Sequence, residues 1–354
     1  MSQDQGQARW QAIWRTRNPT ARALLPIAWV YGAMVVIRRW FYAHRWMSVQ
    51  RLGVPVVVVG NVVVGGAGKT PTVLALIRHL RSSGWHPGVV SRGYGREGES
   101  PLEVLPSTHP GTCGDEPALI RRQADVPVFV ARQRSAAAKA LLRTHPNVDV
   151  ILCDDGLQHL ALGRDLAIAV FDDRGTGNGW LLPAGLLREP WPVSAGATFA
   201  PDLVLQQSNT WPPVQRANPG GIPCFTARRS LSPEVENALG ERAPLASMRG
   251  DNLTAVAGIA RPQAFFDMLE ATGVVIRNAV ALPDHADESR YADILQSVDG
   301  PLLCTEKDAV KLFELARQRA PNRMDRIWAV PLMMQVDPEF FSAIDDRLAS
   351  FRLG

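Results

Sequence analysis

The sequence has 354 residues, of which 46% are hydrophobic and 20% charged, and its formal net charge is +4. A usual domain has ~100–200 residues, so two α/β units in one chain are expected. This composition excludes global disorder and a multi-span membrane protein. The four cysteines lie far apart without a CxxC pair, which excludes a disulfide framework and a zinc cluster and favours a reducing compartment.

The N-terminal segment is basic and aromatic. Residues 1–51 contain eight arginines and one acid, Asp4, which indicates an anionic surface as the partner. No zinc-finger, helix-turn-helix or RNA-binding pattern accompanies them, so no nucleic-acid partner is expected. No secretory signal peptide is expected either. Five of the ten tryptophans lie within the first 46 residues, and tryptophan favours the headgroup region of a membrane.

The uncharged stretch 23–37 would span ~22 Å as a helix, against ~30 Å for a bilayer core. Pro26 and Gly32 weaken such a helix further. We therefore predict that residues 1–50 form a membrane-associated helical segment that lies in the interface, on the cytoplasmic face. A core helix packed on the next domain and a single membrane span are the alternatives.

Apolar β-branched runs alternate with helical patterns from Val54 onward, as expected of parallel strands that helices cover on both faces. The strand-like runs of the first unit are 54–59, 88–90, 126–130, 148–153, 166–171 and 203–205. They predict a doubly wound parallel α/β sheet of the P-loop NTPase type, and we assign this core to residues 51–225.

Residues 207–250 are rich in Pro, Gly, Ser and Asn and are expected to connect two units. Strand-like runs then alternate with helix-like runs, the strands at 253–257, 274–282, 302–305 and 327–331 and the helices at 262–271, 289–296, 308–317 and 338–350. A second, smaller α/β domain is predicted for residues 226–354, with its last helix packing back on the first domain.

A phosphate-binding loop is predicted between the first strand and the helix-like run 73–80. Such a loop needs inward backbone N–H groups, a helix N-terminus, a lysine for the β- and γ-phosphates and a hydroxyl for Mg²⁺. Val63 stands where the strict pattern has glycine, so the loop is a variant. Only four lysines occur in the chain, which argues against a chance match, and we predict an ATP-using enzyme. The loop residues are Val64, Gly65, Gly66, Ala67, Gly68, Lys69 and Thr70.

Acidic residues supply the next candidates. The run 148–153 leads into Asp154 and Asp155, where a P-loop protein keeps the acid that binds Mg²⁺ directly or through water. Alone, an Asp-Asp-Gly sequence indicates a turn; after a P-loop it indicates a metal site. Which of the two aspartates touches the metal is left open.

Phosphate transfer to an alcohol benefits from a group that accepts the hydroxyl proton. Asp115 and Glu116 in a Gly-Asp-Glu-Pro motif, and His285 after Asp284, are candidates. A helix start and a solvated loop are the alternatives. Arg188 lies on a Gly/Pro-rich loop and suits a second anion, with an unpartnered surface arginine as the alternative.

Together these motifs resemble those of the tetraacyldisaccharide 4′-kinases, the lipid A 4′-kinase family. The resemblance runs from about residue 10 to about residue 335, in the family's order. Its motifs are Gly60-Asn61, Val64–Pro71, Ser91–Arg96, Gly114–Pro117, Asp154–His159, Asn178-Gly179, Leu181–Gly185, Leu187–Pro190, Asp284-His285 and Thr305–Asp308.

The resemblance implies an enzyme at the inner membrane that uses ATP and Mg²⁺ and phosphorylates the 4′-hydroxyl of a tetraacyl glucosamine disaccharide 1-phosphate, the lipid A precursor. A peripheral or monotopic monomer is expected. The implied roles are the base pair for Asp115 and His285, metal and nucleotide contacts for Thr70, Glu116, Asp154, Asp155, Gln158 and His159, and lipid headgroup contacts for Asn178, Arg188 and Glu189.

Two other functions compete with this one. The first is an ATPase of the partitioning or metal-insertion kind, which would release phosphate without a lipid acceptor. The second is a membrane adaptor without enzymatic activity, in which the loop binds nucleotide for structural reasons only.

Overall fold

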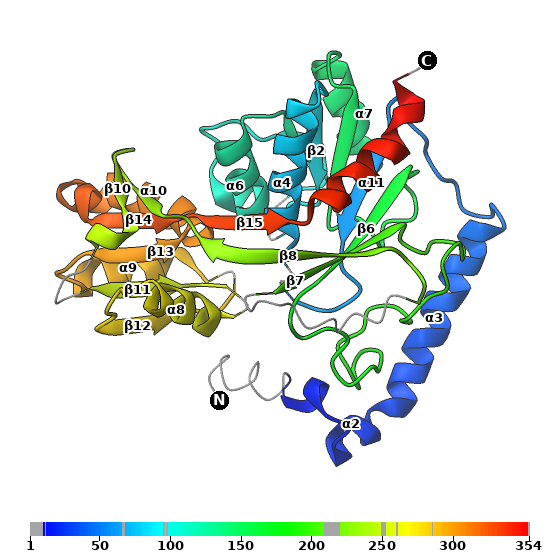
Figure 1. The fold of residues 1–354 in the computed structure, drawn as a ribbon, viewed down its shortest axis with the longest axis horizontal. Coiled ribbons are helices and arrows are strands. Elements are labelled where there is room, and N and C mark those ends of the chain that lie inside the picture. The colour runs from blue at the N-terminus through cyan, green and yellow to red at the C-terminus, as the bar shows by residue number, and fades with distance from the viewer. Residues whose placement is uncertain are drawn as a thin grey trace.

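The computed structural model describes residues 10, 12–65, 68–94, 96, 98–208, 220–248, 253–259, 261–284 and 286–352. Two α/β lobes lie side by side, and an N-terminal helix runs along one edge of the larger lobe (Figure 1).

The larger lobe is built on a sheet with nine strands among the described residues, in the order β15-β8-β7-β6-β1-β5-β2-β4-β3. Neighbours from β8 to β4 are parallel, and the edge strands β15 and β3 run antiparallel to theirs. The predicted α/β class with a large parallel sheet is confirmed. The strands are β1 (Val56–Gly60), β2 (Pro87–Ser91), β3 (Leu102–Glu103), β4 (Val128–Val130), β5 (Val150–Asp154), β6 (Leu166–Phe171), β7 (Leu203–Ser208), β8 (Cys224–Leu231) and β15 (Leu332–Val336).

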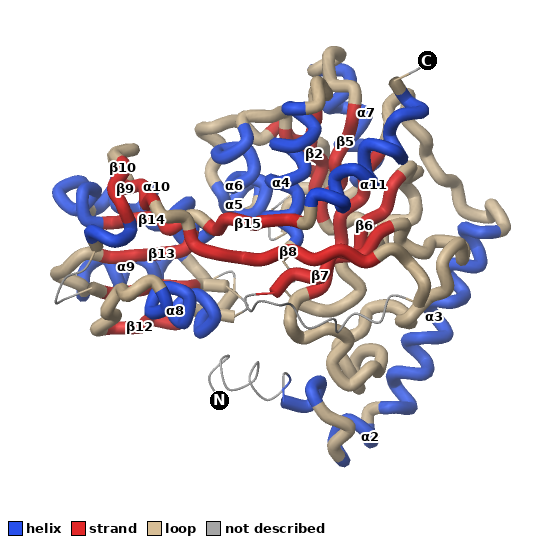
Figure 2. The backbone as a smooth tube through the Cα atoms, viewed as in Figure 1, coloured by secondary structure: helices blue, strands red, loops and turns tan. Residues whose placement is uncertain are grey.

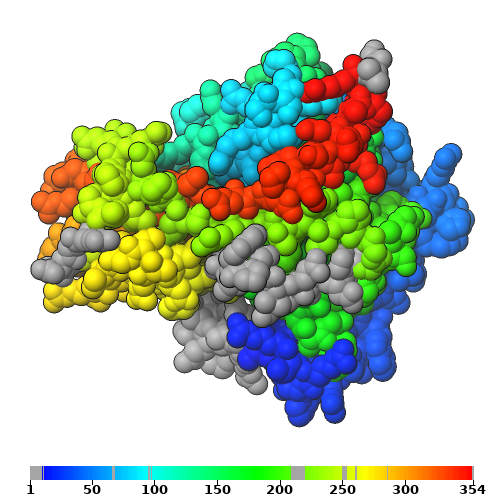
Figure 3. All heavy atoms as spheres, in the orientation of Figure 1, coloured from blue at the N-terminus to red at the C-terminus, as the bar shows by residue number. Residues whose placement is uncertain are grey.

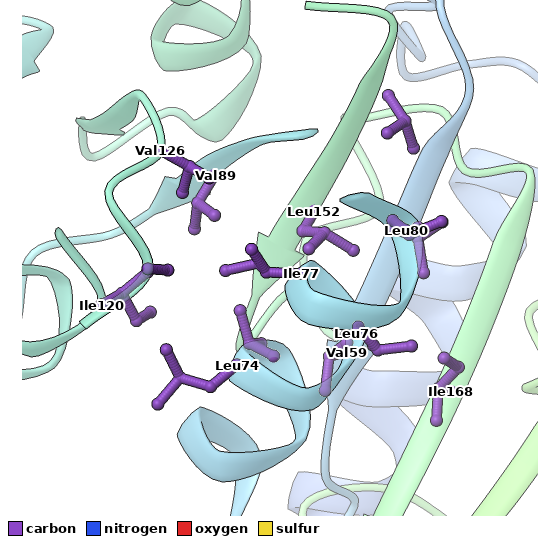
Figure 4. Packing of buried hydrophobic residues seen from close by; sticks show 14 of the residues in the cluster. Val59, Leu74, Leu76, Ile77, Leu80, Val89, Ile120, Val126, Leu152 and Ile168 are labelled. Carbon is purple, nitrogen blue, oxygen red and sulfur yellow. The ribbon is translucent and has the colours of Figure 1, made fainter. Parts of the chain in front are cut away.

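Helices cover both faces of this sheet. In β1, Val57 and Val59 pack on one face and Val56 and Val58 on the other, because successive side chains of a strand alternate. Figure 4 shows Leu76 among the residues of the first face. The covering helices are α4 (Lys69–Ser82), α6 (Asp115–Ala124) and α11 (Pro338–Leu348) on the first face and α7 (Arg134–Thr144) on the second; the short α5 (Pro110–Cys113) precedes α6.

The smaller lobe holds a second sheet, with six strands in the described part of the chain and the order β10-β9-β14-β13-β11-β12. Its helix α8 has the predicted bounds of 262–271. The predicted strand 274–282 is shorter in the structure, because Val274 packs into the core below α8 before β12 begins. The elements are β9 (Glu234–Asn237), β10 (Arg242–Pro244), β11 (Thr254–Ala257), α8 (Pro262–Ala271), β12 (Asn278–Ala281), α9 (Glu288–Ser297), β13 (Leu302–Thr305), α10 (Glu306–Arg319) and β14 (Ile327–Val330).

Residues 207–250, predicted as a connection between the units, also form strands. This stretch contributes β8 to the larger sheet and β9 and β10 to the smaller one. The boundary expected between residues 225 and 226 therefore falls inside β8. The strand forms because its backbone pairs with β15, Leu231 lying opposite Leu332, and local composition carries no signal of so distant a partner. Figures 1 and 2 show β8 and β15 running together between the lobes.

The C-terminal helix α11 packs on the larger lobe. Phe340, Ile344 and Leu348 recur at helical spacing and are buried in the same cluster as Leu80 of α4. Figure 3 shows the C-terminal segment, in red, lying across the surface of that lobe.

The N-terminal segment contains α2 (Pro19–Ala23) and the longer α3 (Leu25–Ala43). Pro26 does not break α3, because it occupies the first turn, where no backbone N–H is needed. Gly32 faces the larger lobe, where an added Cβ would lie 2.8 Å from Cδ1 of Leu181, so it permits close packing of the helix.

Most of the large apolar side chains of α3 are exposed, and we call this set of exposed apolar side chains the outer face of α3. No helix among the described residues combines the length and hydropathy needed to cross a membrane. The outer face consists of Ile27, Trp29, Val30, Met34, Val36, Ile37 and Trp40.

Candidate active site

The predicted phosphate-binding loop lies between β1 and α4, and Lys69 is the first residue of that helix. Gly66 and Ala67 lie outside the described residues. Gly68 has a φ of 77°, and a Cβ on it would lie 1.8 Å from Oε1 of Gln207, so only glycine fits there. The side chain of Gln207 also donates Nε2–H to the Gly68 carbonyl at 2.8 Å.

Polar contacts hold the start of the loop in place. Asn61 donates Nδ2–H to the Gly65 carbonyl at 3.0 Å. The backbone N–H of Val64 donates to the Leu186 carbonyl at 2.8 Å, and Arg174 donates Nη1–H to the Val64 carbonyl at 3.0 Å. A fixed loop that leads into a helix N-terminus is a preorganised site for a phosphate anion.

Asp154 ends β5, the neighbour of β1, and lies level with Val59. It is fully buried, and neither carboxylate oxygen has a hydrogen-bond partner among the described residues. Burial, aided by the charge of Glu116, raises the pKa of Asp154 to about 7 against the lowering effect of Lys69. Such an orphaned carboxylate is stabilised by a bound cation.

Asp155 faces cations instead. Its Oδ1 lies 3.6 Å from Nζ of Lys69 and 3.3 Å from Nη1 of Arg188. Burial alone would raise the pKa of Asp155, but Lys69, Arg188 and Arg134 outweigh it and hold that pKa below its ordinary value. The buried Arg134 also donates Nη2–H to the Asp155 carbonyl at 2.7 Å. Sequence reasoning missed Arg134, because nothing local distinguishes an arginine that begins an alanine-rich helix.

A cavity of about 200 Å³ lies between the lobes at this loop. Gly68, Lys69, Thr70 and Glu116 line it from the larger lobe. The smaller lobe supplies apolar side chains and also Arg261, Asp284, Thr305, Glu306 and Lys307. A lining of charged and apolar groups suits a ligand that joins a phosphate chain to a flat ring. The apolar residues of the lining include Leu74, Leu119, Leu231, Ile259, Ala264, Phe265, Met268, Val330 and Leu332.

The residues present fit Mg²⁺, which prefers oxygen ligands, keeps several waters and binds through one or two carboxylates plus phosphate oxygens. The orphaned carboxylate of Asp154 offers such a ligand, and Glu116 is near enough to influence it. Within the described ranges, no group of three or more His, Cys, Asp or Glu side chains could enclose a metal. Both observations agree with a metal site in which the protein supplies one or two oxygen ligands and the phosphates of the nucleotide supply others.

Asp115 begins α6 and is buried. Its Oδ2 lies 3.0 Å from Nζ of Lys311, on α10 of the smaller lobe. Lys307 of the same helix donates Nζ–H to Oδ1 of Asp284 at 2.6 Å, and Asp284 lines the cavity. His285 lies outside the described residues. Lys307 and Lys311 were not among the predicted site residues. The sequence did contain a signal for them, because two of its four lysines lie in this one helix.

Gln158 and His159 lie just after the aspartates. Gln158 donates Nε2–H to the Asn61 carbonyl at 3.0 Å, and its Oε1 lies 3.5 Å from Nη1 of Arg188. Burial, followed by the charge of Arg134, lowers the pKa of His159 to about 4. This imidazole is therefore neutral at pH 7, and its buried Nε2 has no hydrogen-bond partner among the described residues.

The expected headgroup residues divide into two kinds. Glu189 forms an ion pair with Arg39 of α3, so α3 is attached to the loop that carries Arg188. Tyr31 of α3 donates its hydroxyl to the Arg188 carbonyl at 2.8 Å.

Asn178 is not one of the residues that line the cavity at the phosphate-binding loop. Its Nδ2 donates to the carbonyls of Thr16 and Ala184 at 3.2 and 2.9 Å, and its Oδ1 accepts from the backbone of Trp180. Its amide thus ties the N-terminal segment to the loop, and its contact with the lipid headgroup stays a prediction.

The fold and this site define the class of protein. A phosphate-binding loop between a buried strand and a helix, with a carboxylate at the end of the adjacent parallel strand, is the nucleotide site of P-loop phosphotransferases and NTPases. The family model described as tetraacyldisaccharide-1-P 4′-kinase matches residues 20–349. The chain belongs to this family, and the resemblance found in its motifs is confirmed.

Known relatives agree over nearly the whole chain. The tetraacyldisaccharide 4′-kinase of Delftia acidovorans is 47% identical over 343 residues, covering 97% of this chain and 95% of that protein. The one from Acidovorax sp. strain JS42 is 48% identical over 344 residues, with the same coverage. Among solved structures, the apo form of LpxK from Aquifex aeolicus in complex with ATP has a TM-score of 0.76 at 26% identity and covers 94% of this chain and 99% of its own.

Proposed function

We propose that this chain transfers the γ-phosphate of ATP to the 4′-hydroxyl of a tetraacyl glucosamine disaccharide 1-phosphate, the precursor of lipid A. The single observation that carries this is the cavity that Lys69, Thr70 and Glu116 line between the lobes, in a member of a 4′-kinase family. A structural relative was solved in complex with ATP, which supports ATP as the phosphate donor.

The nucleotide site works by positioning and by charge. Lys69 and the backbone of the loop would hold the phosphates, and Thr70 and Asp154 would hold Mg²⁺. When bound there, the metal would supply positive charge opposite the transferred phosphate. Arg188 and Lys69 keep Asp155 ionised and in place. The neutral His159 offers an imidazole that can accept or donate one hydrogen bond in this region.

The general base is Asp115, paired with His285. Its position supports this: the carboxylate is buried at the N-terminus of α6 and faces the ammonium group of Lys311 from the other lobe. A buried carboxylate at such a position can accept the proton of the acceptor hydroxyl. The lobes must both contribute for this base to be held in place.

The enzyme acts as a monomer on the cytoplasmic face of the inner membrane. The outer face of α3 supports this placement: Trp29 is 69% and Met34 63% exposed, and exposed arginines such as Arg38 flank them. A monomeric soluble surface rarely exposes so many large apolar side chains together, whereas an interfacial helix requires them. Through Arg39 and Tyr31, α3 holds the loop with Arg188 and Glu189, which supports headgroup contacts close to the membrane.

The deciding experiment combines purified protein, labelled ATP and a disaccharide 1-phosphate lipid. Phosphate should appear on the lipid, and ATP should be consumed only when the lipid is present. Release of phosphate at the same rate without lipid would favour the rival ATPase. Lys69→Ala should abolish lipid phosphorylation, and Lys139→Ala, at an exposed position of α7, is the matched control. A wild-type protein that binds ATP but never labels the lipid would favour the adaptor.

A further inference from the structure

Two arginines that do not belong to the phosphate-binding loop line the cavity between the lobes. Arg229 lies on β8 of the larger sheet, and Arg261 lies immediately before α8 of the smaller lobe. Both line the cavity that Gly68, Lys69 and Thr70 line. The two guanidinium groups are close enough to influence each other electrostatically. Two like charges from different lobes therefore meet at one ligand cavity.

The nearest carboxylates do not satisfy these arginines. Nη1 of Arg261 is 3.7 Å from Oδ2 of Asp172, and Nη2 of Arg229 is 3.9 Å from Oδ2 of Asp173. Both distances exceed those of a hydrogen bond. Nε and Nη2 of Arg229 and Nη1 of Arg261 are buried and have no hydrogen-bond partner among the described residues.

Asp172 is already engaged by another arginine. Arg174 donates Nε–H to both of its carboxylate oxygens, at 3.0 and 2.9 Å, and uses Nη1–H for the loop carbonyl of Val64. The cluster of Asp172, Asp173, Arg174, Arg229 and Arg261 thus holds more positive than negative charge. Burial lowers the pKa of the Arg229 guanidinium, as expected of a cation that lacks full compensation. A buried guanidinium in this state favours an anionic ligand.

We propose that Arg229 and Arg261 bind the polyphosphate chain of the nucleotide together with Lys69. This rests on the proposed function, because it takes ATP as the occupant of the cavity. A guanidinium group matches phosphate oxygens with two parallel N–H donors. The apolar side chains of the lining, including Ile259 and Phe265, suit the base of the nucleotide. The arginines suit its phosphates.

The test measures nucleotide binding to the full-length protein without lipid. ATP and adenosine each displace a fluorescent trinitrophenyl-ATP probe in the presence of Mg²⁺. Arg261→Gln and Arg229→Gln should each weaken ATP ~10- to 100-fold, the usual effect of one charge-assisted hydrogen bond, and should leave adenosine within about twofold. Arg228→Gln is the matched control, because its side chain lies next to Arg229 on the other face of β8 and is exposed.

Three results would overturn this assignment. One is an unchanged ATP affinity in Arg261→Gln, whose side chain is 32% exposed and whose replacement is therefore compatible with folding even if Arg229→Gln is not. Another is an equal loss for adenosine, which would mean that the arginines only shape the cleft. The third is a rise in KM for the lipid alone, which would assign the arginines to the lipid 1-phosphate. Failure of the proposed function would look different, because wild-type protein would bind ATP normally and leave the lipid unlabelled.

Discussion

Placing glutamates on the outer face of α3 tests the contact with the membrane most directly. Met34 and Ile37 are 63% and 54% exposed, so Met34→Glu/Ile37→Glu changes the surface without opening the core. Burying a whole side chain of this size in an apolar medium is worth ~1.5–3 kcal/mol. With rather more than half of each side chain available, the pair contributes roughly 2–4 kcal/mol to membrane binding. That corresponds to a ~30- to 1000-fold loss in partitioning.

The assay is co-sedimentation with vesicles that contain anionic lipid. Val275→Glu is the matched control, because Val275 is 71% exposed on the smaller lobe, away from α3. The control should sediment like the wild type, while the double variant should stay in the supernatant with an unchanged melting temperature. The double variant should also keep its affinity for ATP in solution.

Equal sedimentation of the double variant and the wild type would refute the role of α3. Equal losses in the double variant and in Val275→Glu would show that added negative charge, rather than the outer face, controls binding.

The remaining predictions concern the site and the junction of the lobes. Lys69→Ala should lower kcat/KM for ATP by at least ~10²-fold in a lipid phosphorylation assay, since the phosphates lose their cation in a buried site; activity close to wild type would exclude its assigned contact. Asp115→Ala should lower kcat by ~10²–10⁴ with little change in ATP affinity, and a change confined to KM would instead give Asp115 a binding role. Burial raises the pKa of Glu306 from 4.5 to about 7, so the contribution of Glu306 to stability is fully present below pH 4.5, and up to about 3 kcal/mol of it is lost as the pH rises through 7. Glu306→Gln retains an acceptor for the Leu332 N–H, now 3.0 Å away, and should remove that loss; urea unfolding at pH 5 and pH 8 checks this, and an identical pH dependence in both proteins would contradict it.

Local features of the chain were readable from the sequence. The phosphate-binding loop, the strand at Leu166–Phe171 and the helix that begins at Pro262 depend on nearby residues: glycines that permit a tight turn, apolar runs and a proline in the first helical turn. The order of the short motifs then indicated the family, because such motifs can be recognised in the sequence without knowledge of the fold.

Other features came from residues far apart in the chain. The pairing of β8 with β15 joins residues about 100 positions apart, and the Pro- and Gly-rich composition before β8 indicated a connection instead. Gly32 looked like a weak point of a helix, but Leu181 makes it a close-packing position. The hydrogen bond from the Asn178 amide to the N-terminal segment likewise has no local signal in the sequence.

By itself, the sequence determined that a nucleotide loop, two carboxylates after a buried strand and an aromatic, arginine-rich N-terminus occur in one α/β protein. Only the tertiary structure decided that Asp154 is orphaned, that Asp155 faces Lys69 and Arg188, and that Arg229 and Arg261 meet in the cleft. The physical reason is that turn and strand preferences act over a few residues, whereas burial and charge pairing depend on which distant segments the fold brings together.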